Sequence, residues 1–319
     1  MKNMIIKSKM LGILTVLVAG VISMQSSIAQ NNDEPAKAKP VKNTFQSVWI
    51  IDNQTVMVPV KGTLEMDIQH RFGTWDKGYQ DMWGFFAPSN IRMGLSYAPI
   101  KNLNLGIGIT KANMLWDASA KYAIQQQTPG SMPVSVSYYA NMAYDTRENP
   151  TTNDGSDLNY DVERFSYFHQ LIIARKVTDN LSLQVAPSLS HQNAVSGYYI
   201  KNDAGELEEY QTMKFDHFAV ALAARYKLTD VTSIMVNYDQ PLTQHSQFNP
   251  NPNLGIGVEL NTSSHSFQIF ASNYSLLSQQ RNNLYNNNNP FKYVDSVTGK
   301  EVEGSKFLLG FNITRLWNY

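Results

Sequence analysis

The chain has 319 residues with 26 basic and 26 acidic side chains, so its formal net charge is zero. This balance argues against a nucleic-acid-binding protein, which would carry a basic patch. The absence of cysteine excludes disulfides, thiolate metal sites and a cysteine nucleophile. A mean hydropathy of −0.32 is too polar for a bundle of membrane-spanning helices. It does not exclude a membrane barrel, in which only alternate residues face lipid.

The N-terminus has the features of an export signal. A basic start and an uncharged, mostly apolar stretch are followed by small residues at Ser27 and Ala29, which fit a cleavage site. We therefore predict a signal peptide over residues 1–29. Residues 30–45 are polar and contain two prolines, so they predict a flexible leader. No later segment has the ~18 consecutive apolar residues of a spanning helix.

From about residue 46 to the end, the dominant hydrophobic pattern has a period of two. In residues 63–72, apolar side chains such as Ile68 alternate strictly with charged or polar ones such as Asp67, which indicates a strand with two different faces. Residues 165–176 are apolar on both faces. Similar runs begin near residues 90, 103, 116, 134, 165, 181, 218, 234, 254, 267 and 307. We predict about twelve strands, which form a single antiparallel up-and-down transmembrane β-barrel over residues 46–319.

The links between these runs tend to be short and long in alternation. Residues 99–102 and 177–180 are short links, whereas residues 144–163 and 273–305 are long ones. Membrane barrels have this arrangement, with short periplasmic turns and long outer loops. The link at residues 111–114 departs from it, because it is short where a long one is expected. The long loops are polar and rich in asparagine, so we expect them to be solvated.

Four stretches of the chain are similar to a known family: residues 62–75, 88–112, 132–140 and 168–192. The most specific parts are the sequence HRFG at residues 70–73 and the strand start NIR at residues 90–92. The chain resembles, from about residue 45 to its end, a bacterial outer-membrane β-barrel family known as domain of unknown function 5777. The resemblance implies a barrel in the outer membrane of a Gram-negative cell, and it implies no activity.

The sequence contains no persuasive catalytic or metal-binding pattern. The histidines lack the HExxH spacing of a zinc site, and the motifs GxSxG, GxGxxG and the phosphate-binding loop are absent. A lipid-facing Ser/His pair, as in an outer-membrane phospholipase, would need both side chains on one face. Neighbours such as Ser190 and His191 point to opposite faces of a strand. We therefore expect no enzyme, no cofactor and no metal.

Nine charged residues fall on the non-apolar side of their strands, so they would face the lumen if the apolar side meets lipid. Their mixed signs exclude a strongly selective field of one sign. They either line a watered path or pair across strands and fill the lumen. The candidate lumen-lining residues are Glu65, Asp67, Arg71, Arg92, Asp117, Lys121, Arg225, Asp239 and Glu259.

Three functions remain open at this point. The first is an outer-membrane barrel that acts as a narrow pore or carrier for small polar solutes. The second is a structural or interaction barrel with a plugged lumen, whose long outer loops dock a partner. The third is a soluble periplasmic barrel in which Leu64, Met66 and Ile68 line a cavity for an apolar ligand. The expected partners are outer-membrane lipid and small polar solutes, and the sequence indicates no particular protein partner.

Overall fold

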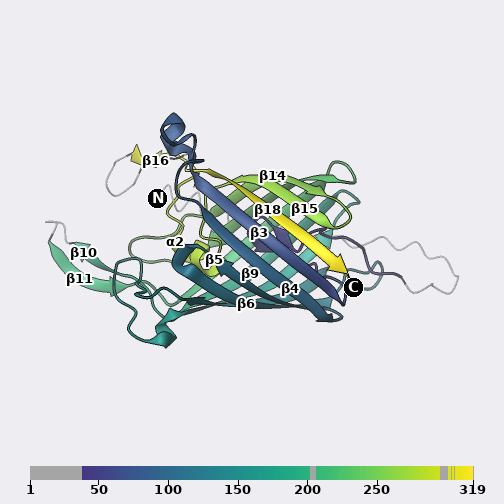
Figure 1. Ribbon diagram of the computed structural model, residues 1–319, viewed down its shortest axis with the longest axis horizontal. Coiled ribbons are helices and arrows are strands. Elements are labelled where there is room, and N and C mark those ends of the chain that lie inside the picture. Colours follow the sequence, from purple (N-terminus) through teal and green to yellow (C-terminus); the bar gives the residue numbers. More distant parts are fainter. Residues whose placement is uncertain (1–37, 202–205, 295–300, 303, 305, 319) are drawn as a thin grey trace.

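The computed structural model describes residues 38–201, 206–294, 301–302, 304 and 306–318, so the predicted signal peptide lies outside the described residues. Twelve strands form one closed antiparallel barrel (Figure 1), which confirms the predicted fold class. The barrel closes where the last strand pairs with the first, and β9 pairs directly with β12, the next strand of the barrel along the chain. The strands are β3 (Thr63–Thr74), β4 (Asn90–Ile100), β5 (Leu103–Thr110), β6 (Leu115–Gln125), β7 (Ser135–Asp145), β8 (Phe165–Lys176), β9 (Leu181–Gln192), β12 (Asp216–Lys227), β13 (Thr232–Pro241), β14 (Asn253–Asn261), β15 (His265–Ser272) and β18 (Leu308–Asn318).

Each of the twelve predicted runs forms one barrel strand, and the two faces separate as predicted in every strand except β8, for which the sequence left the faces open. Met93, Ile107 and Ile269 point outward and are 43%, 58% and 57% exposed, whereas Glu65 and Gln268 are buried inside. An apolar band on the outside and polar residues inside is the arrangement of a barrel that spans a lipid bilayer. Among the described residues, no helix is both long and apolar enough to cross a membrane.

Leu64, Met66 and Ile68 lie on the outward face of β3, because they alternate with the buried Thr63, Glu65, Asp67 and Gln69. A soluble barrel that binds an apolar ligand would need these three side chains inside. The cavity that this alternative requires is therefore not formed by them.

The two ends of the barrel differ in their connections. Short turns join the strands at one end, here the turn end, and most of the long links gather at the other, here the loop end. In Figure 1 the loop end is on the left, with α2 and the β10–β11 hairpin, and the C-terminus is on the right. The link at residues 111–114 lies at the loop end as a single 3-10 turn. The loop-end elements are η1 (Trp75–Asp81), η2 (Ala112–Met114), η3 (Asp161–Arg164), β10 (Gly197–Lys201), β11 (Leu207–Thr212), α2 (Gln279–Tyr285), β16 (Tyr293–Val294) and β17 (Glu301–Val302).

The interior of the barrel is occupied by the chain that precedes β3. Residues 44–57, here the lumen hairpin, are buried along almost their whole length. They contain two short paired strands, β1 (Trp49–Ile50) and β2 (Asn53–Gln54), which belong to a sheet separate from the barrel. The predicted boundary between leader and barrel, at residue 45, falls inside this buried segment.

One side of the lumen is apolar and packs against the lumen hairpin. Phe45 and Ile51 belong to the same buried cluster as Phe168 and Ile172 of β8, together with small inward residues of β12 such as Ala221. These small residues leave room for the hairpin beside the wall. The cluster also explains why β8 is apolar on both faces, since one face meets lipid and the other meets the hairpin.

Candidate functional site

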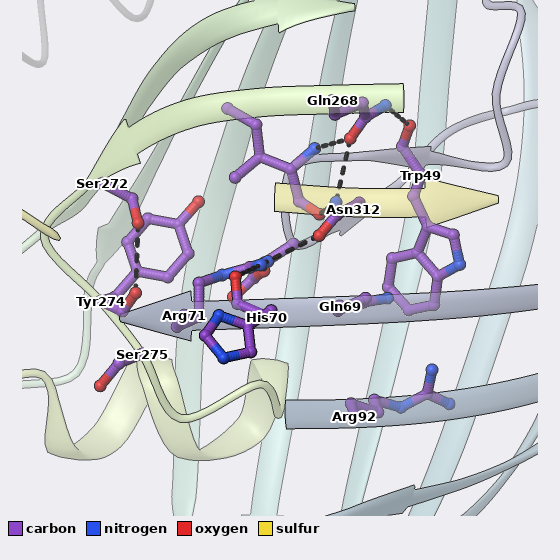
Figure 2. Close-up of polar contacts among 12 residues, drawn as sticks. Trp49, Gln69, His70, Arg71, Arg92, Gln268, Ser272, Tyr274, Ser275 and Asn312 are labelled. Carbon is purple, nitrogen blue, oxygen red and sulfur yellow. Dashed lines mark hydrogen bonds and ion pairs between the residues drawn. The ribbon is translucent and has the colours of Figure 1, made fainter. Parts of the chain in front are cut away.

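The lumen hairpin turns at Ile51 and Asp52, because Ile50 pairs with Asn53 across a two-residue loop. Ile51 has a φ of 59°, a backbone conformation that a β-branched residue rarely adopts. Both of its backbone groups are bound by the barrel wall. Its N–H donates to Gln268 Oε1 at 3.1 Å, and its carbonyl accepts from Asn312 Nδ2 at 2.7 Å. Figure 2 shows Gln268 and Asn312 directed at this part of the hairpin.

Wall side chains also bind the hairpin backbone on both sides of the turn. Gln268 Nε2 donates to the carbonyl of Trp49 at 2.7 Å, and Gln184 Nε2 donates to that of Gln54 at 2.8 Å. Ser137 Oγ donates to the carbonyl of Val56 at 2.9 Å. The barrel thus holds the hairpin through side-chain hydrogen bonds, which satisfy its buried peptide groups, and not through a strand ladder.

The tip of the hairpin is held from the loop end as well. The Asp52 carboxylate forms an ion pair with Arg71 and accepts a hydrogen bond from Asn282 Nδ2 at 3.1 Å. Gln279 Nε2 donates to the Asp52 carbonyl at 2.9 Å. Asn282 and Gln279 belong to α2, so Asp52 joins the hairpin, the wall and the loop between β15 and β18.

The segment around α2 corrects one expectation from the sequence. The Asn-rich loop is expected to be solvated, and Asn287 is exposed, but Asn282, Asn283 and Asn286 are buried at the barrel mouth. Gln280 is also buried, and it donates to Asn141 of β7 at 3.0 Å. The amide side chains replace water as partners of the polar wall, which is why a polar segment can fold inward here.

The opposite side of the lumen carries a charge cluster. Arg92 Nη1 lies 2.9 Å from Asp67 Oδ1, and its Nη2 and Nε lie 2.8 and 3.0 Å from the two oxygens of Asp117. The guanidinium therefore neutralises two carboxylates, one of them in bidentate geometry. Gly94 and Gly108 face each other across β4 and β5 beside it, and a Cβ on either one would collide with this cluster.

We predict that Gly108→Ala destabilises the barrel by about 1–3 kcal/mol, the usual cost of overpacking. The added methyl group would meet the Arg92 guanidinium and the Asp117 carboxylate. Urea titration of the folded fraction in lipid vesicles measures the effect. An unchanged midpoint for Gly108→Ala would contradict the prediction.

Four of the nine charged residues singled out from the sequence form polar contacts with the lumen hairpin. Each one meets a polar residue of the hairpin, so the hairpin takes part in the charge balance of the lumen. The pairs are Arg71 with Asp52, Lys121 with Gln54 at 2.8 Å, Arg225 with Gln46 at 2.5 Å, and Asp239 with Asn53 at 2.6 Å.

The other five also lie on the inner wall, and one of them, Arg92, reaches the hairpin, since its guanidinium carbon lies 5.4 Å from the centre of the Trp49 ring. Asp67, Arg92 and Asp117 form the charge cluster; the first two are buried, and the side chain of Asp117 is 8% exposed. Glu259 pairs with Arg225 at 2.6 Å. Glu65 is buried and lines a small cavity together with Lys121.

Sequence reasoning missed the uncharged residues that bind the hairpin. The alternation already placed Gln184, Gln268 and Asn312 on the inward face of their strands, but a search restricted to charged residues left them out. It also missed the hairpin itself, since periodicity does not reveal that a short apolar run lies inside a barrel rather than in its wall.

Little free space remains around the lumen hairpin. In the part of the chain that the structure describes, the cavities next to Trp49 have volumes of about 10 and 20 Å³. A single water needs about 10–15 Å³. These two cavities beside Trp49 therefore have room for isolated waters only.

The Ser/His neighbours follow the geometry expected of a strand. Ser190 is buried on the inner face, whereas His191 points outward, where its Nδ1 lies 2.7 Å from Asp216 Oδ1. Within the described residues, no three histidine or acidic side chains are grouped so that they could hold a metal ion.

Solved structures with a similar arrangement include two porins and a channel. The chain is 9% identical to the NanC porin (TM-score 0.42, covering 80% of this chain and 99% of that one). It is 10% identical to the KdgM porin (TM-score 0.41, 80% and 99%). It is 12% identical to an outer membrane channel from Pseudomonas putida F1 (TM-score 0.45, 82% and 97%). A search of curated proteins gave no match.

A family model described as a membrane bound beta barrel domain matches residues 45–317, which include the lumen hairpin except Thr44 and all twelve strands up to Trp317. The match covers most of the chain, and it agrees with the apolar outer face and the polar interior of the barrel. The chain belongs to the membrane bound beta barrel domain family DUF5777.

Proposed function

We propose that the protein is an outer-membrane channel for small polar solutes, closed by its lumen hairpin. The observation that carries this proposal is that residues 44–57 fill the lumen without joining the barrel ladder. Because each barrel strand already has two neighbours, the hairpin can leave without breaking a strand pair. A channel of this kind needs no catalysis.

The wall behind the hairpin suits the passage of polar solutes. Arg71, Lys121, Arg225 and Asp239 would exchange their hairpin contacts for water, as expected of the polar interior of a membrane channel. Both signs of charge are present on this wall. We therefore infer that the open lumen admits small polar solutes without strong selection for one sign of charge.

The hairpin enters the lumen from the turn end. The N–H of Val41 donates to the carbonyl of Gln127 in the turn between β6 and β7, and that of Gly62 donates to the carbonyl of Ala98 near the end of β4. Short turns face the periplasm in bacterial membrane barrels. We infer that the hairpin leaves toward the periplasm, with its connection to β3 as the hinge.

A closed interaction barrel is the second candidate, and the position of α2 favours it. Gln280 and Leu284 of α2 are buried, so α2 closes the lumen from the loop end as well. In that case removal of the hairpin would leave the barrel shut. Conductance measurements distinguish the two candidates.

Asp52→Ala should raise the open probability of the channel. It removes the partner of the fully buried Arg71 and a contact of Asn282, and loss of one partner from a buried ion pair typically costs about 3–5 kcal/mol. Single-channel recording measures the effect. Asp230→Ala is the matched control, since this carboxylate is 96% exposed in a turn. Equal open probabilities for the two variants would show that the contacts of Asp52 do not hold the hairpin in the lumen.

The proposal as a whole is tested with the chain from residue 30 onward in a planar lipid bilayer. We expect a mostly closed protein with brief openings to potassium chloride. A protein that never conducts, even after removal of the hairpin, would overturn the channel and leave the interaction barrel.

A further inference from the structure

We propose that residues 75–87, here the aromatic lobe, insert into the lipid layer at the loop end of the barrel as an interfacial anchor. The lobe belongs to the link between β3 and β4 and contains η1. It lies outside the lumen, so the inference is independent of the channel proposal.

The lobe exposes an unusual number of large apolar side chains. Its five most exposed ones are Tyr79 at 81%, Met82 at 42%, Trp83 at 50%, Phe85 at 47% and Phe86 at 83%. So many exposed apolar side chains in one short segment are unusual on a surface that faces water, where large apolar patches mark contact with a membrane or another protein.

The lobe has a defined conformation that presents these side chains. Met82 and Trp83 have φ values of 54° and 53°, and Gly84 follows with 85°, so the chain reverses sharply. Asp81 Oδ1 accepts the Gly84 N–H at 3.0 Å, and the Gly84 carbonyl accepts the Gly73 N–H at 3.0 Å. A Cβ on Gly84 would collide with the Gly73 carbonyl, so the lobe rests directly on the end of β3.

The position of the lobe identifies lipid as its partner. Phe72 points outward from β3, within the apolar face that meets the bilayer, and its ring centroid lies 4.6 Å from that of Phe85. In Figure 1 the helical coil that follows β3 stands beyond the outline of the barrel wall at the loop end. The lobe therefore extends the lipid-facing surface sideways at the level where the strands end.

The chemistry of the lobe matches the boundary between headgroups and acyl chains. Tyr79 and Trp83, whose ring centroids are 6.2 Å apart, are of the residue types that concentrate at this boundary because one part of each ring is apolar and another is polar. Lys77 is exposed in the same lobe, where its ammonium group can meet lipid phosphates. Phe85 and Phe86 then reach the upper acyl region.

Tryptophan fluorescence tests the anchor in the complete barrel. The chain from residue 30 onward and its Trp83→Phe variant are folded into phosphatidylcholine vesicles, with and without bromine on the acyl chains close to the headgroup. The difference between the two proteins isolates the emission of Trp83. We expect brominated lipid to quench most of this difference signal and aqueous iodide to quench little of it.

Two other tryptophans serve as references. Trp116 is 60% exposed among the outward residues of β6 and should be quenched by brominated lipid, whereas Trp49 lies in the lumen and should be protected. They are isolated with Trp116→Phe and Trp49→Phe. Quenching of Trp83 by iodide and not by brominated lipid would show that the lobe faces water and overturn the anchor. Protection of Trp83 from both quenchers, with a dimer on size-exclusion chromatography, would overturn it in favour of a second copy of the chain.

Discussion

A chain that starts at residue 58 should conduct ions continuously, with a mean conductance about tenfold or more above that of the chain with its hairpin. Side chains alone can fill a barrel of eight strands, whereas this barrel has twelve strands and is wider, so we expect its lumen to be open once the hairpin is removed. The truncation removes the lumen hairpin and leaves every barrel strand intact, since β3 begins at Thr63. Planar-bilayer recording in potassium chloride measures the change.

The matched control for this truncation is a chain that starts at residue 38, which lacks most of the leader and keeps the hairpin. We expect it to remain mostly closed. A barrel that folds without residues 44–57, as judged by a heat-dependent shift on a gel, and yet does not conduct would contradict the hairpin as the gate.

Ile269→Arg should block insertion of the barrel or strongly destabilise it. Ile269 points outward in the middle of β15, between Val258 and Phe311 on the neighbouring strands. An arginine on the lipid face costs about 2–4 kcal/mol at the bilayer midplane and about 0–1 near its surface. Urea-dependent folding into vesicles, followed by gel mobility, measures the difference.

Leu260→Arg is the control for depth. Leu260 also points outward, but it lies next to the last residue of β14 at the turn end. We expect this variant to fold almost as well as the unmodified chain. Equal tolerance of arginine at both positions would mean that this face does not meet the bilayer core.

The barrel strands were predictable because each one solves the same physical problem. One face meets lipid and the other meets a polar interior, so the period of two survives in strands as different as β3 and β14. The turns between them carry no apolar side chains that need burial. The twelve strands, and the faces of all of them except β8, therefore followed from local patterns alone.

The contents of the lumen were not predictable in the same way. The inward Phe168 and Ile172 made the face assignment of β8 ambiguous, because their partners Phe45 and Ile51 come from a segment more than a hundred residues earlier. The segment around Asn286 looked like a solvated loop, because its amides can bond to water or to a polar wall equally well. Which of these partners a side chain meets depends on the closed barrel, which brings segments far apart in the sequence into one lumen.

The charged residues illustrate the difference between a face and a function. Alternation was sufficient to place Arg92 and Lys121 on the inner face, since a charge on the lipid side is costly. Their partners could not be found in this way, because Asp117 lies two strands away from Arg92, and Gln54 belongs to the hairpin. The mixed signs of the wall are consistent with both a filled lumen and an open one.

Reversible cross-linking of the hairpin to the wall tests the central claim most directly. Val56→Cys and Ser137→Cys place two thiols at a site where Ser137 Oγ lies 2.9 Å from the Val56 carbonyl, in a chain with no cysteine of its own. A short reducible cross-linker is then applied in the planar bilayer. If the hairpin is the gate of the channel, openings should disappear on cross-linking and return when the linker is reduced. Openings that continue unchanged with the hairpin fixed to the wall would contradict it.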